Sequence, residues 1–283
     1  MGDVEITVAA LQLTSGADEV HNVERALALL EDAIARGATY IQLPEYFNYY
    51  GSASRYEQVA ELIPGPLTRR LGELALAHRV TIHVGSMLER SRDATQFFNT
   101  SVVIGRDGEV RATYRKVHLF DIEVPGEVSY RESRAIGAGR ELVTVELEEF
   151  TLGLSICFDV RFPELYRTLA LRGATVLAIP SAFNARTGRA HWEVLVRARA
   201  IENLCFVIAA AQAGTTAQGL ASYGHAMIVD PWGEVLATSD AAGEDVVVAS
   251  IDLGEVARRR AQIATLELRR PDLYGLDVDA EHH

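Results

Sequence analysis

The sequence has 283 residues, of which 48% are hydrophobic and 23% are charged, as expected for one large α/β domain or two small ones. No apolar run reaches the ~18 residues of a membrane helix, and a net charge of −12 without a basic cluster argues against binding to nucleic acid or an anionic membrane. Two cysteines, Cys157 and Cys205, do not make a disulfide framework, so we expect a reducing compartment, most simply the cytoplasm.

No linker or low-complexity tract divides the chain, so we expect a single domain over residues 1–275. Residues 276–283 form a short tail whose last histidines resemble the remnant of a purification tag. The first strand follows the N-terminus without a basic segment, and we expect no signal peptide.

The hydrophobic pattern predicts strands that alternate with amphipathic helices along the whole chain. Two of the predicted helices, 22–36 and 66–78, have apolar stripes with helical spacing, and the second has proline in its first turn. The predicted helices span residues 22–36, 66–78, 162–172 and 190–203. The predicted strands span residues 4–13, 39–43, 80–88, 99–104, 110–115, 142–147, 152–156, 175–179, 205–210, 226–229 and 246–251.

Two segments of the chain repeat one another. Residues 36–48 read "RGATYIQLPEYFN" and residues 172–184 read "RGATVLAIPSAFN", with seven of thirteen positions identical. Each copy has a glycine, Gly37 or Gly173, where a helix is expected to stop. A second pair of similar segments resembles hairpin turns between strands, "GRDGEVRAT" at 105–113 and "DPWGEVLAT" at 230–238. We therefore expect two similar halves, each with one sheet, and a four-layer α-β-β-α sandwich if the sheets pack face to face.

Three reactive or charged side chains share one position, just after an apolar strand. Glu45 follows the strand at 39–43, Lys116 follows 110–115, and Cys157 follows 152–156. Ligands collect at the carboxyl ends of strands in α/β sheets, so the three side chains converge if these strands are neighbours. Lys116 is also the single lysine among 27 basic residues. Either a guanidinium cannot replace its ammonium, or it is a chance survivor on the surface.

Such a trio suits nucleophilic attack on a carbonyl or nitrile carbon. A thiol reacts once it loses its proton, and Glu45 is a candidate general base for Cys157. Lys116 would then stabilise the developing negative charge, together with a backbone N–H such as that of Phe158.

The segments that carry these residues resemble a known family. "LPEYF", "YRKVHLFD" and "SICFDVRFPEL" resemble the Glu, Lys and Cys signatures of the nitrilase superfamily, the carbon–nitrogen hydrolases. The resemblance extends from the first strand to "RRPDLYG" at 269–275. It implies the α-β-β-α sandwich, hydrolysis through a cysteine thioester without a metal or organic cofactor, and a homodimer or higher homo-oligomer.

The resemblance also implies a second glutamate in the site. The segment "VPGEVSYRES" offers Glu132, which we prefer for its sequence context, and Glu127 as the nearby competitor. Glu132 could alternatively be a solvated loop carboxylate, since most carboxylates are exposed.

Phe158 and Asp159 after the nucleophile make the chain similar to amidases rather than true nitrilases. Other segments resemble omega-amidases and the amidases of deaminated glutathione, so we expect the terminal carboxamide of a small carboxylate-bearing substrate to be hydrolysed with release of ammonia. Arg161 could bind the substrate carboxylate, or instead form a salt bridge with Asp159 or Glu164. By analogy with the family, further residues expected to contact substrate are Tyr49, Phe158, Phe183 and Thr187.

Two other functions remain open from sequence: an N-carbamoyl amino acid hydrolase, and a silent binding protein on the same fold. Cys205 is interpreted as a buried packing residue. His118 and His191 could border the pocket, but no spacing typical of a metal site is present, and Glu45 already fills the role of base.

Overall fold

The computed structural model of the chain describes residues 4–124, 128–216, 219, 221–240 and 242–274. Within these residues the strands form two large sheets and a separate two-stranded ribbon. The first sheet contains β1 (Glu5–Leu13), β2 (Tyr40–Gln42), β3 (Thr81–His83), β4 (Met87–Arg90), β5 (Phe97–Ile104), β6 (Val110–Arg115), β9 (Ile136–Gly137), β14 (Ala211–Thr215), β15 (Ala221–Tyr223) and β18 (Asp245–Asp252). The second sheet contains β10 (Thr144–Glu146), β11 (Thr151–Leu154), β12 (Val176–Ala178), β13 (Phe206–Ala209), β16 (Met227–Val229) and β17 (Val235–Thr238).

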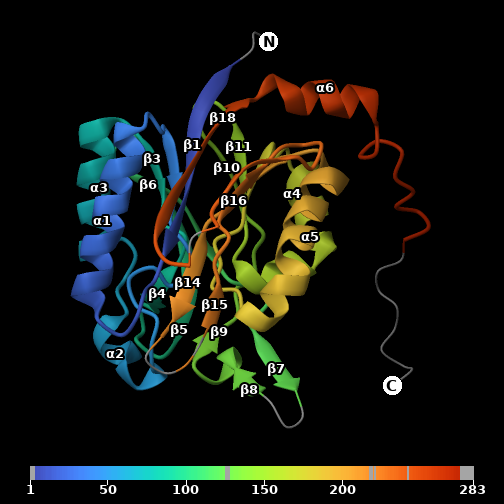
Figure 1. Cartoon of the computed structure of the whole chain (residues 1–283). Helices are drawn as coiled ribbons and strands as arrows, with labels where there is room; N and C mark the ends of the chain where they lie inside the picture. The colour runs from blue at the N-terminus through green and yellow to red at the C-terminus, as the bar shows by residue number, and fades with distance from the viewer. Residues whose placement is uncertain (1–3, 125–127, 217–218, 220, 241, 275–283) are drawn as a thin grey trace.

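Helices cover the outer face of each sheet, which makes four layers. In Figure 1, α1 and α3 lie on one side of the strands, and α4 and α5 lie on the other side. The ribbon of β7 (Asp121–Val124) and β8 (Val128–Arg131) lies at one end of the sandwich, and α6 lies at the opposite end. The helices are α1 (Glu19–Ala35), α2 (Tyr56–Val59), α3 (Pro66–His78), α4 (Pro163–Leu171), α5 (Ala185–Asn203) and α6 (Gly254–Gln262), with short 3₁₀ turns η1 (Ala53–Arg55), η2 (Glu132–Arg134) and η3 (Cys157–Arg161).

The two sheets have the same topology, which confirms the two repeated halves. In the first sheet the neighbours run β18-β1-β2-β3-β5-β6, and in the second they run β10-β11-β12-β13-β16-β17. The pairings are antiparallel, parallel, parallel, antiparallel and antiparallel in both sheets. Helices α1 and α4 occupy equivalent crossovers, as do α3 and α5. The predicted α-β-β-α sandwich is therefore present.

The repeated glycines end equivalent helices. Gly37 and Gly173 both follow the last turn of a helix, α1 and α4, with φ of +86° and +96°. No heavy atom lies within 4 Å of a Cβ built on either glycine. Glycine is favoured here because a left-handed backbone strains other residues, while space around the position is ample.

Alternate side chains of strand β1 pack into two different parts of the hydrophobic core. Alternate residues such as Val8 pack into the cluster that includes the second sheet, whereas Leu11 packs into the cluster beneath α1 and α3. Both side chains are fully buried. A strand with apolar residues on both faces is expected when each face is covered by another layer.

The structure corrects the expected strand at 80–88, which is broken into β3 and β4. Gly85 between them has φ +62°, and a Cβ there would lie 2.1 Å from the Leu43 carbonyl oxygen and 2.2 Å from that of Pro44. The close approach of the loop that leads to Glu45 therefore requires glycine at this position. An unbroken strand could not accommodate that loop.

The expected strand at 205–210 is also followed by an unexpected crossing between sheets. After β13 the chain continues directly into β14, whose residue Ala211 pairs with Gln12 of β1 in the first sheet. The predicted helix at 190–203 begins earlier, at Ala185, because the Asn184 side chain accepts a 2.9 Å hydrogen bond from the Arg186 N–H and caps it.

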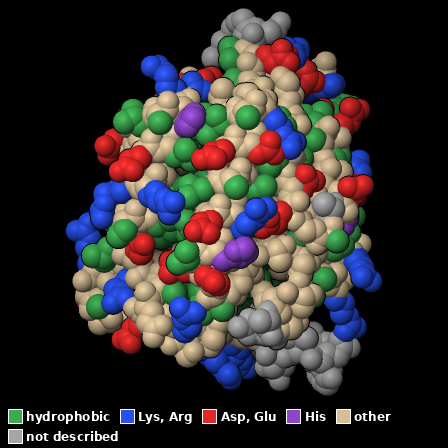
Figure 2. Space-filling view, turned by 60° about the vertical axis from the view of Figure 1, so that its left-hand side comes forward, with side chains coloured by type: hydrophobic (Ala, Val, Ile, Leu, Met, Phe, Trp, Pro, Cys, Tyr) green, Lys and Arg blue, Asp and Glu red, His purple; other side chains and the backbone are tan. Residues whose placement is uncertain are grey.

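The face that carries α1 and α3 has basic and acidic side chains interspersed, without a continuous basic patch (Figure 2). None of the helices in the described ranges combines the length and apolar character needed to cross a lipid bilayer.

Candidate active site

The three strand-end residues meet at the end of the sandwich where the β7–β8 ribbon lies. Glu45 and Lys116 follow strands of the first sheet, while Cys157 follows a strand of the second. The strands that precede these residues, β2, β6 and β11, are not hydrogen-bonded neighbours, so the condition under which convergence was expected from sequence is not met. The side chains converge instead across the interface between the two sheets.

Lys116 lies between two carboxylates. Its ammonium donates to Glu45 Oε1 at 2.8 Å and to Glu132 Oε2 at 2.9 Å, and all three side chains are buried. Burial alone would lower the pKa of Lys116, but the charges of Glu132 and Glu45 outweigh it and raise that pKa well above its ordinary value. The ammonium is therefore a fixed positive charge over the working pH range.

Neutral donors complete the hydrogen bonds of the two carboxylates. The Asn99 amide donates to both Glu45 Oε1 and Glu132 Oε1, at 2.9 and 3.1 Å. The Tyr46 hydroxyl donates to Glu132 Oε1 at 2.7 Å. The backbone N–H of Ala182 donates to Glu45 Oε2 at 2.8 Å, so a residue of the second half orients the carboxylate of the first.

Glu132 is buried and paired with Lys116, so it is not a solvated loop carboxylate. It also accepts a 2.7 Å hydrogen bond from the Phe120 N–H. Burial opposes ionisation, but the Lys116 charge and these hydrogen bonds prevail and lower the pKa of Glu132. Glu127, the alternative considered from sequence, lies outside the described residues.

Cys157 occupies a tight turn with a left-handed backbone. Its φ is +47°, which is uncommon for a residue with a side chain, and its N–H donates to the Pro180 carbonyl at 2.9 Å. Burial, and then the nearby Glu45 charge, raise the pKa of Cys157 well above its ordinary value, while Lys116 lowers it in part. A hydrogen bond links the thiol to the Glu45 carboxylate. The resting group is therefore a thiol with a base in contact.

Asp159 holds this turn against the segment that follows Lys116. One carboxylate oxygen accepts from the Ile156 N–H and the Tyr114 hydroxyl, both at 2.8 Å. The other accepts from the His118 N–H at 3.1 Å and from its ring Nδ1 at 2.8 Å. The aspartate is fully buried, so it links the two loops that carry Cys157 and Lys116.

A cavity of about 70 Å³ opens over these groups. Arg161 lies in its wall, with its guanidinium 5.1 Å from the Phe183 ring centre and 5.8 Å from that of Phe158. Among the described residues Arg161 has no salt bridge to Asp159 or Glu164, and its polar contact is a 3.3 Å interaction with the His191 ring. The cavity is lined by Glu45, Tyr46, Tyr50, Lys116, Phe120, Ile122, Tyr130, Glu132, Cys157, Phe158, Arg161, Ala182, Phe183, Asn184, Thr187 and Ala221.

All but one of the site residues that were predicted from sequence and that the structure describes line this cavity. The exception is Tyr49, which is buried outside it, with its hydroxyl donating to the Ser52 carbonyl at 2.9 Å. The neighbouring Tyr50 lines the cavity in its place. His118 and His191 are not among the lining residues: the His118 ring contacts Asp159 and the His191 ring contacts Arg161. Cys205 is buried in the second-sheet core.

Sequence reasoning missed the polar residues that support the charged ones. Asn99 begins a polar run with Thr100 and Ser101 between the apolar ends of strand β5, and this interruption of the pattern was an available signal. Tyr46 has φ +55°, which no sequence pattern shows. Tyr50 and Tyr130 lie in a loop and in the ribbon, where hydrophobic periodicity is weak.

Glu132 predicts a specific pH dependence of stability. Because its pKa is lowered in the folded chain, its contribution is complete above its ordinary value of 4.5 and is lost as the pH falls through the folded-state value. Glu132→Gln should lower the free energy of unfolding by roughly 1–3 kcal/mol at neutral pH. Urea unfolding of both proteins should show that this difference in the free energy of unfolding becomes smaller in acid. The exposed Glu73→Gln on α3 should show no such change, and a gap that stays constant with pH would contradict the assignment.

Comparisons with known proteins show the family to which the chain is related. A family model described as carbon–nitrogen hydrolase matches residues 7–261. Omega-amidase NIT2 of Homo sapiens is 39% identical over 271 residues, which cover 96% of this chain and 97% of that protein. Deaminated glutathione amidase of Bos taurus is 41% identical over 273 residues, which cover 95% of this chain and 83% of that protein.

A solved structure shows the same arrangement of elements. The crystal structure of the C. elegans NitFhit protein matches with a TM-score of 0.90 at 40% sequence identity, covering 98% of this chain and 68% of that chain. The family match spans the sequence from β1 to α6, and thus includes both halves of the sandwich.

Proposed function

This chain belongs to the carbon–nitrogen hydrolase family, and we propose that it is an amidase acting on a small, carboxylate-bearing substrate: the terminal carboxamide of the 2-oxoglutaramate type, with release of ammonia, or the amide of the deaminated glutathione type. The observation that carries the proposal is the meeting of a thiol, a carboxylate in contact with it, and a buried ammonium in one small cavity. The relatives named above supply the class of substrate.

In the first step, Glu45 takes the thiol proton of Cys157 as the sulfur attacks the amide carbon. The carbonyl π electrons move to oxygen, where the Lys116 ammonium stabilises the negative charge. The C–N bond then breaks as Glu45 returns its proton to nitrogen. Ammonia leaves, and the acyl group remains on Cys157 as a thioester.

In the second step, a water molecule attacks the thioester while Glu45 accepts its proton. The C–S bond breaks, the carboxylic acid is released, and the proton returns to the Cys157 sulfur. Because the folded site raises the pKa of that thiol, proton transfer accompanies attack, and no standing thiolate is required. Glu132 acts in both steps by holding Lys116 in place.

We assign recognition of the substrate carboxylate to Arg161. It borders the cavity, is half-buried, and has no salt bridge with any described carboxylate. Its guanidinium can therefore offer two N–H donors to a substrate carboxylate. Phe158, Phe183 and Thr187 line the same side of the cavity and would contact the carbon skeleton.

A panel of amides tests this proposal. Ammonia release should be fastest with ω-carboxamide acids such as 2-oxoglutaramate, and slow with simple aliphatic amides. Arg161→Gln should raise KM for the acids about tenfold or more, as expected for loss of a charge-assisted hydrogen bond, with little change for uncharged amides. A preference for uncharged amides in the unmodified enzyme would contradict the Arg161 role. Release of carbon dioxide with ammonia from ureido acids would indicate an N-carbamoyl hydrolase instead.

We also propose that the protein is a cytoplasmic homodimer. Both cysteines are free and buried, as suits a reducing compartment. Val194 and Ile201 of α5 are 68% and 48% exposed, and they form an apolar stripe on the outer helical layer. The segment after α6, residues 263–274, runs beside that layer (Figure 1) and exposes Leu268 by 76%. Light scattering during size-exclusion chromatography should give twice the 31.0 kDa chain mass.

A further inference from the structure

His191 contacts the guanidinium to which we assign the substrate carboxylate. Its ring Nδ1 lies 3.3 Å from Nη1 of Arg161, and neither step of the hydrolysis uses this histidine. A guanidinium carries only hydrogen-bond donors, so Nδ1 accepts the bond and the imidazole is neutral, with its proton on Nε2. The contact therefore fixes one N–H of Arg161 and leaves the other donors of the fork for a ligand.

Two aromatic rings restrain the position of the same guanidinium. The ring centres of Phe183 and Phe158 lie 5.1 and 5.8 Å from its central carbon. Phe183 is itself packed against Trp192, the residue after His191, with ring centres 5.1 Å apart. The face of a ring attracts a cation without offering a directional acceptor, so the rings leave the rotation of the fork undetermined. Among the residues in the described ranges, His191 supplies the directional acceptor that Arg161 needs.

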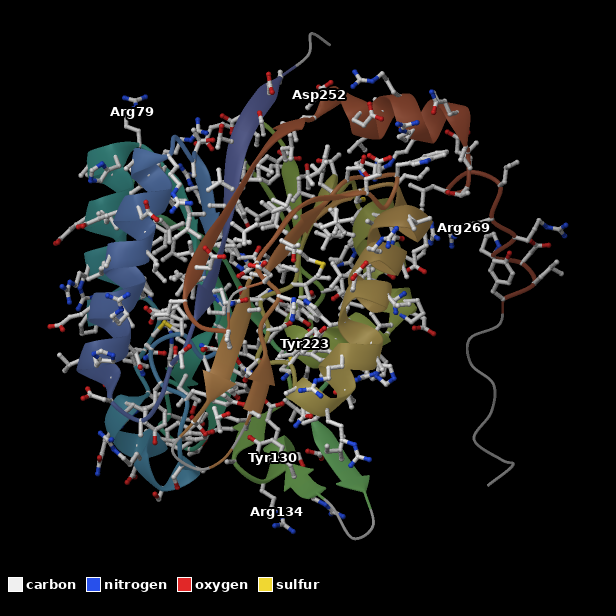
Figure 3. The ribbon with its side chains drawn as sticks, in the orientation of Figure 1. Arg79, Tyr130, Arg134, Tyr223, Asp252 and Arg269 are labelled. Carbon is white, nitrogen blue, oxygen red and sulfur yellow. The ribbon has the colours of Figure 1, made fainter. Side chains whose placement is uncertain are left out.

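Helix α5 presents His191 beside the cavity. Thr187, which lines the cavity, comes four residues earlier, so the two side chains lie on one face of the helix, one turn apart. Close packing fixes the start of this helix, because a Cβ built on Gly188 would lie 2.4 Å from the Tyr223 side chain. Figure 3 shows Tyr223 at the end of α5 that is nearer to the β7–β8 ribbon. His191 is thus held by a well-anchored helix although its side chain is exposed.

We propose that His191 is a positioning residue, which holds the Arg161 fork in the direction that receives a carboxylate on the acyl chain of the substrate. The inference rests on the proposed amidase function and concerns selectivity, not the bond-breaking steps.

The benefit of this contact is a smaller loss of freedom on binding. A mobile arginine side chain loses rotational freedom when it binds a ligand, and that loss weakens the binding. A guanidinium that His191 and two rings already hold in place loses less. The enzyme therefore gains affinity for carboxylate-bearing amides, while the attack of Cys157 on the amide carbon is unchanged.

Two amides of equal chain length test this role: glutaramate, which ends in a carboxylate, and pentanamide, which has a methyl group in its place. His191→Leu should raise KM for glutaramate about three- to tenfold, the scale of one hydrogen bond, and keep kcat within about twofold. KM for pentanamide should not change. His191→Asn should keep KM for glutaramate within about twofold of the unmodified enzyme, because its amide oxygen is attached to Cγ, as Nδ1 is, and accepts from Arg161.

A double-mutant cycle separates an effect through Arg161 from a direct one. In the Arg161→Gln background, His191→Leu should leave KM for glutaramate unchanged, because the group that it positions has been removed. An equal KM rise from His191→Leu in both backgrounds would overturn the proposal. Equal KM rises for the two amides would also overturn it, because they would indicate a general change in the cavity wall.

His21→Leu is the matched control, because His21 is an exposed histidine near the start of α1, which covers the other sheet. It should leave both KM values unchanged. An unmodified enzyme that cleaves neither amide would contradict the amidase function itself. Titration calorimetry with glutarate would then still decide the role of His191, because binding of this dicarboxylate needs no turnover. His191→Leu should weaken glutarate binding about three- to tenfold, and an unchanged dissociation constant would overturn the proposal.

Discussion

Cys157→Ala should abolish amide hydrolysis, lowering kcat by roughly 10⁴-fold or more, because no other group can form the acyl intermediate. The thiol of Cys157 is the proposed nucleophile, which the left-handed turn holds beside Glu45. The residual rate should be measured with 2-oxoglutaramate by ammonia release. Mass spectrometry of the unmodified enzyme, quenched during turnover, should show an acyl group on the peptide that contains Cys157.

Cys205→Ala is the matched control for this substitution. Cys205 is also fully buried, but it lies in the core and contacts the Ala174 carbonyl and the Arg260 guanidinium at 3.3 and 3.1 Å. The substitution should lower the free energy of unfolding modestly and change kcat by no more than about twofold, because Cys205 lies away from the cavity and the cavity residues stay in place. Activity that survives Cys157→Ala, or acylation found on Cys205, would refute the assignment of the nucleophile.

Lys116→Arg should lower kcat by roughly 10²–10³-fold although the charge is kept, as for the loss of one oxyanion-stabilising donor. The ammonium is 2% exposed and fits between two carboxylates at 2.8 and 2.9 Å. A planar guanidinium is broader and cannot occupy the same point without displacing Glu45 or Glu132. Both the activity and the thermal unfolding of the variant should be measured, so that a direct loss of activity can be distinguished from unfolding of the protein.

Arg115→Lys is the control, because it makes the reverse exchange at the adjacent residue. Arg115 pairs with Glu89 on the partly exposed side of β6, away from the cavity. This variant should retain nearly full activity. A fully active Lys116→Arg enzyme would mean that positive charge alone, without the compact shape of the ammonium, is enough for the reaction.

Much of the fold could be predicted because its elements follow regular local rules. The helix at 66–78 was predicted with the bounds observed for α3, since proline starts it and its apolar stripe is regular. The repeated glycines correctly indicated two equivalent halves. Elements without strong periodicity were missed, including α6, which is highly charged, and the crossing strand β14.

The breaks in the pattern came from contacts distant in sequence. The expected strand at 80–88 ends at Gly85 because the loop before Glu45 packs against it, and neither segment reveals the other. Tyr49 and Tyr50 could not be distinguished from sequence, because which one faces the cavity depends on how the loop folds over Tyr56 and the ribbon.

The order of residues alone was enough to show which chemical groups are available and where they stand: a glutamate, a thiol and the single lysine, each just after an apolar strand. The folded chain was needed to show that these groups meet across two sheets, that Asn99 and Tyr46 donate hydrogen bonds to the carboxylates, and that Asp159 secures the Cys157 turn. The reason is physical. Strand and helix formation respond to neighbouring residues, whereas a buried charge is tolerated only where distant parts of the chain supply its partners.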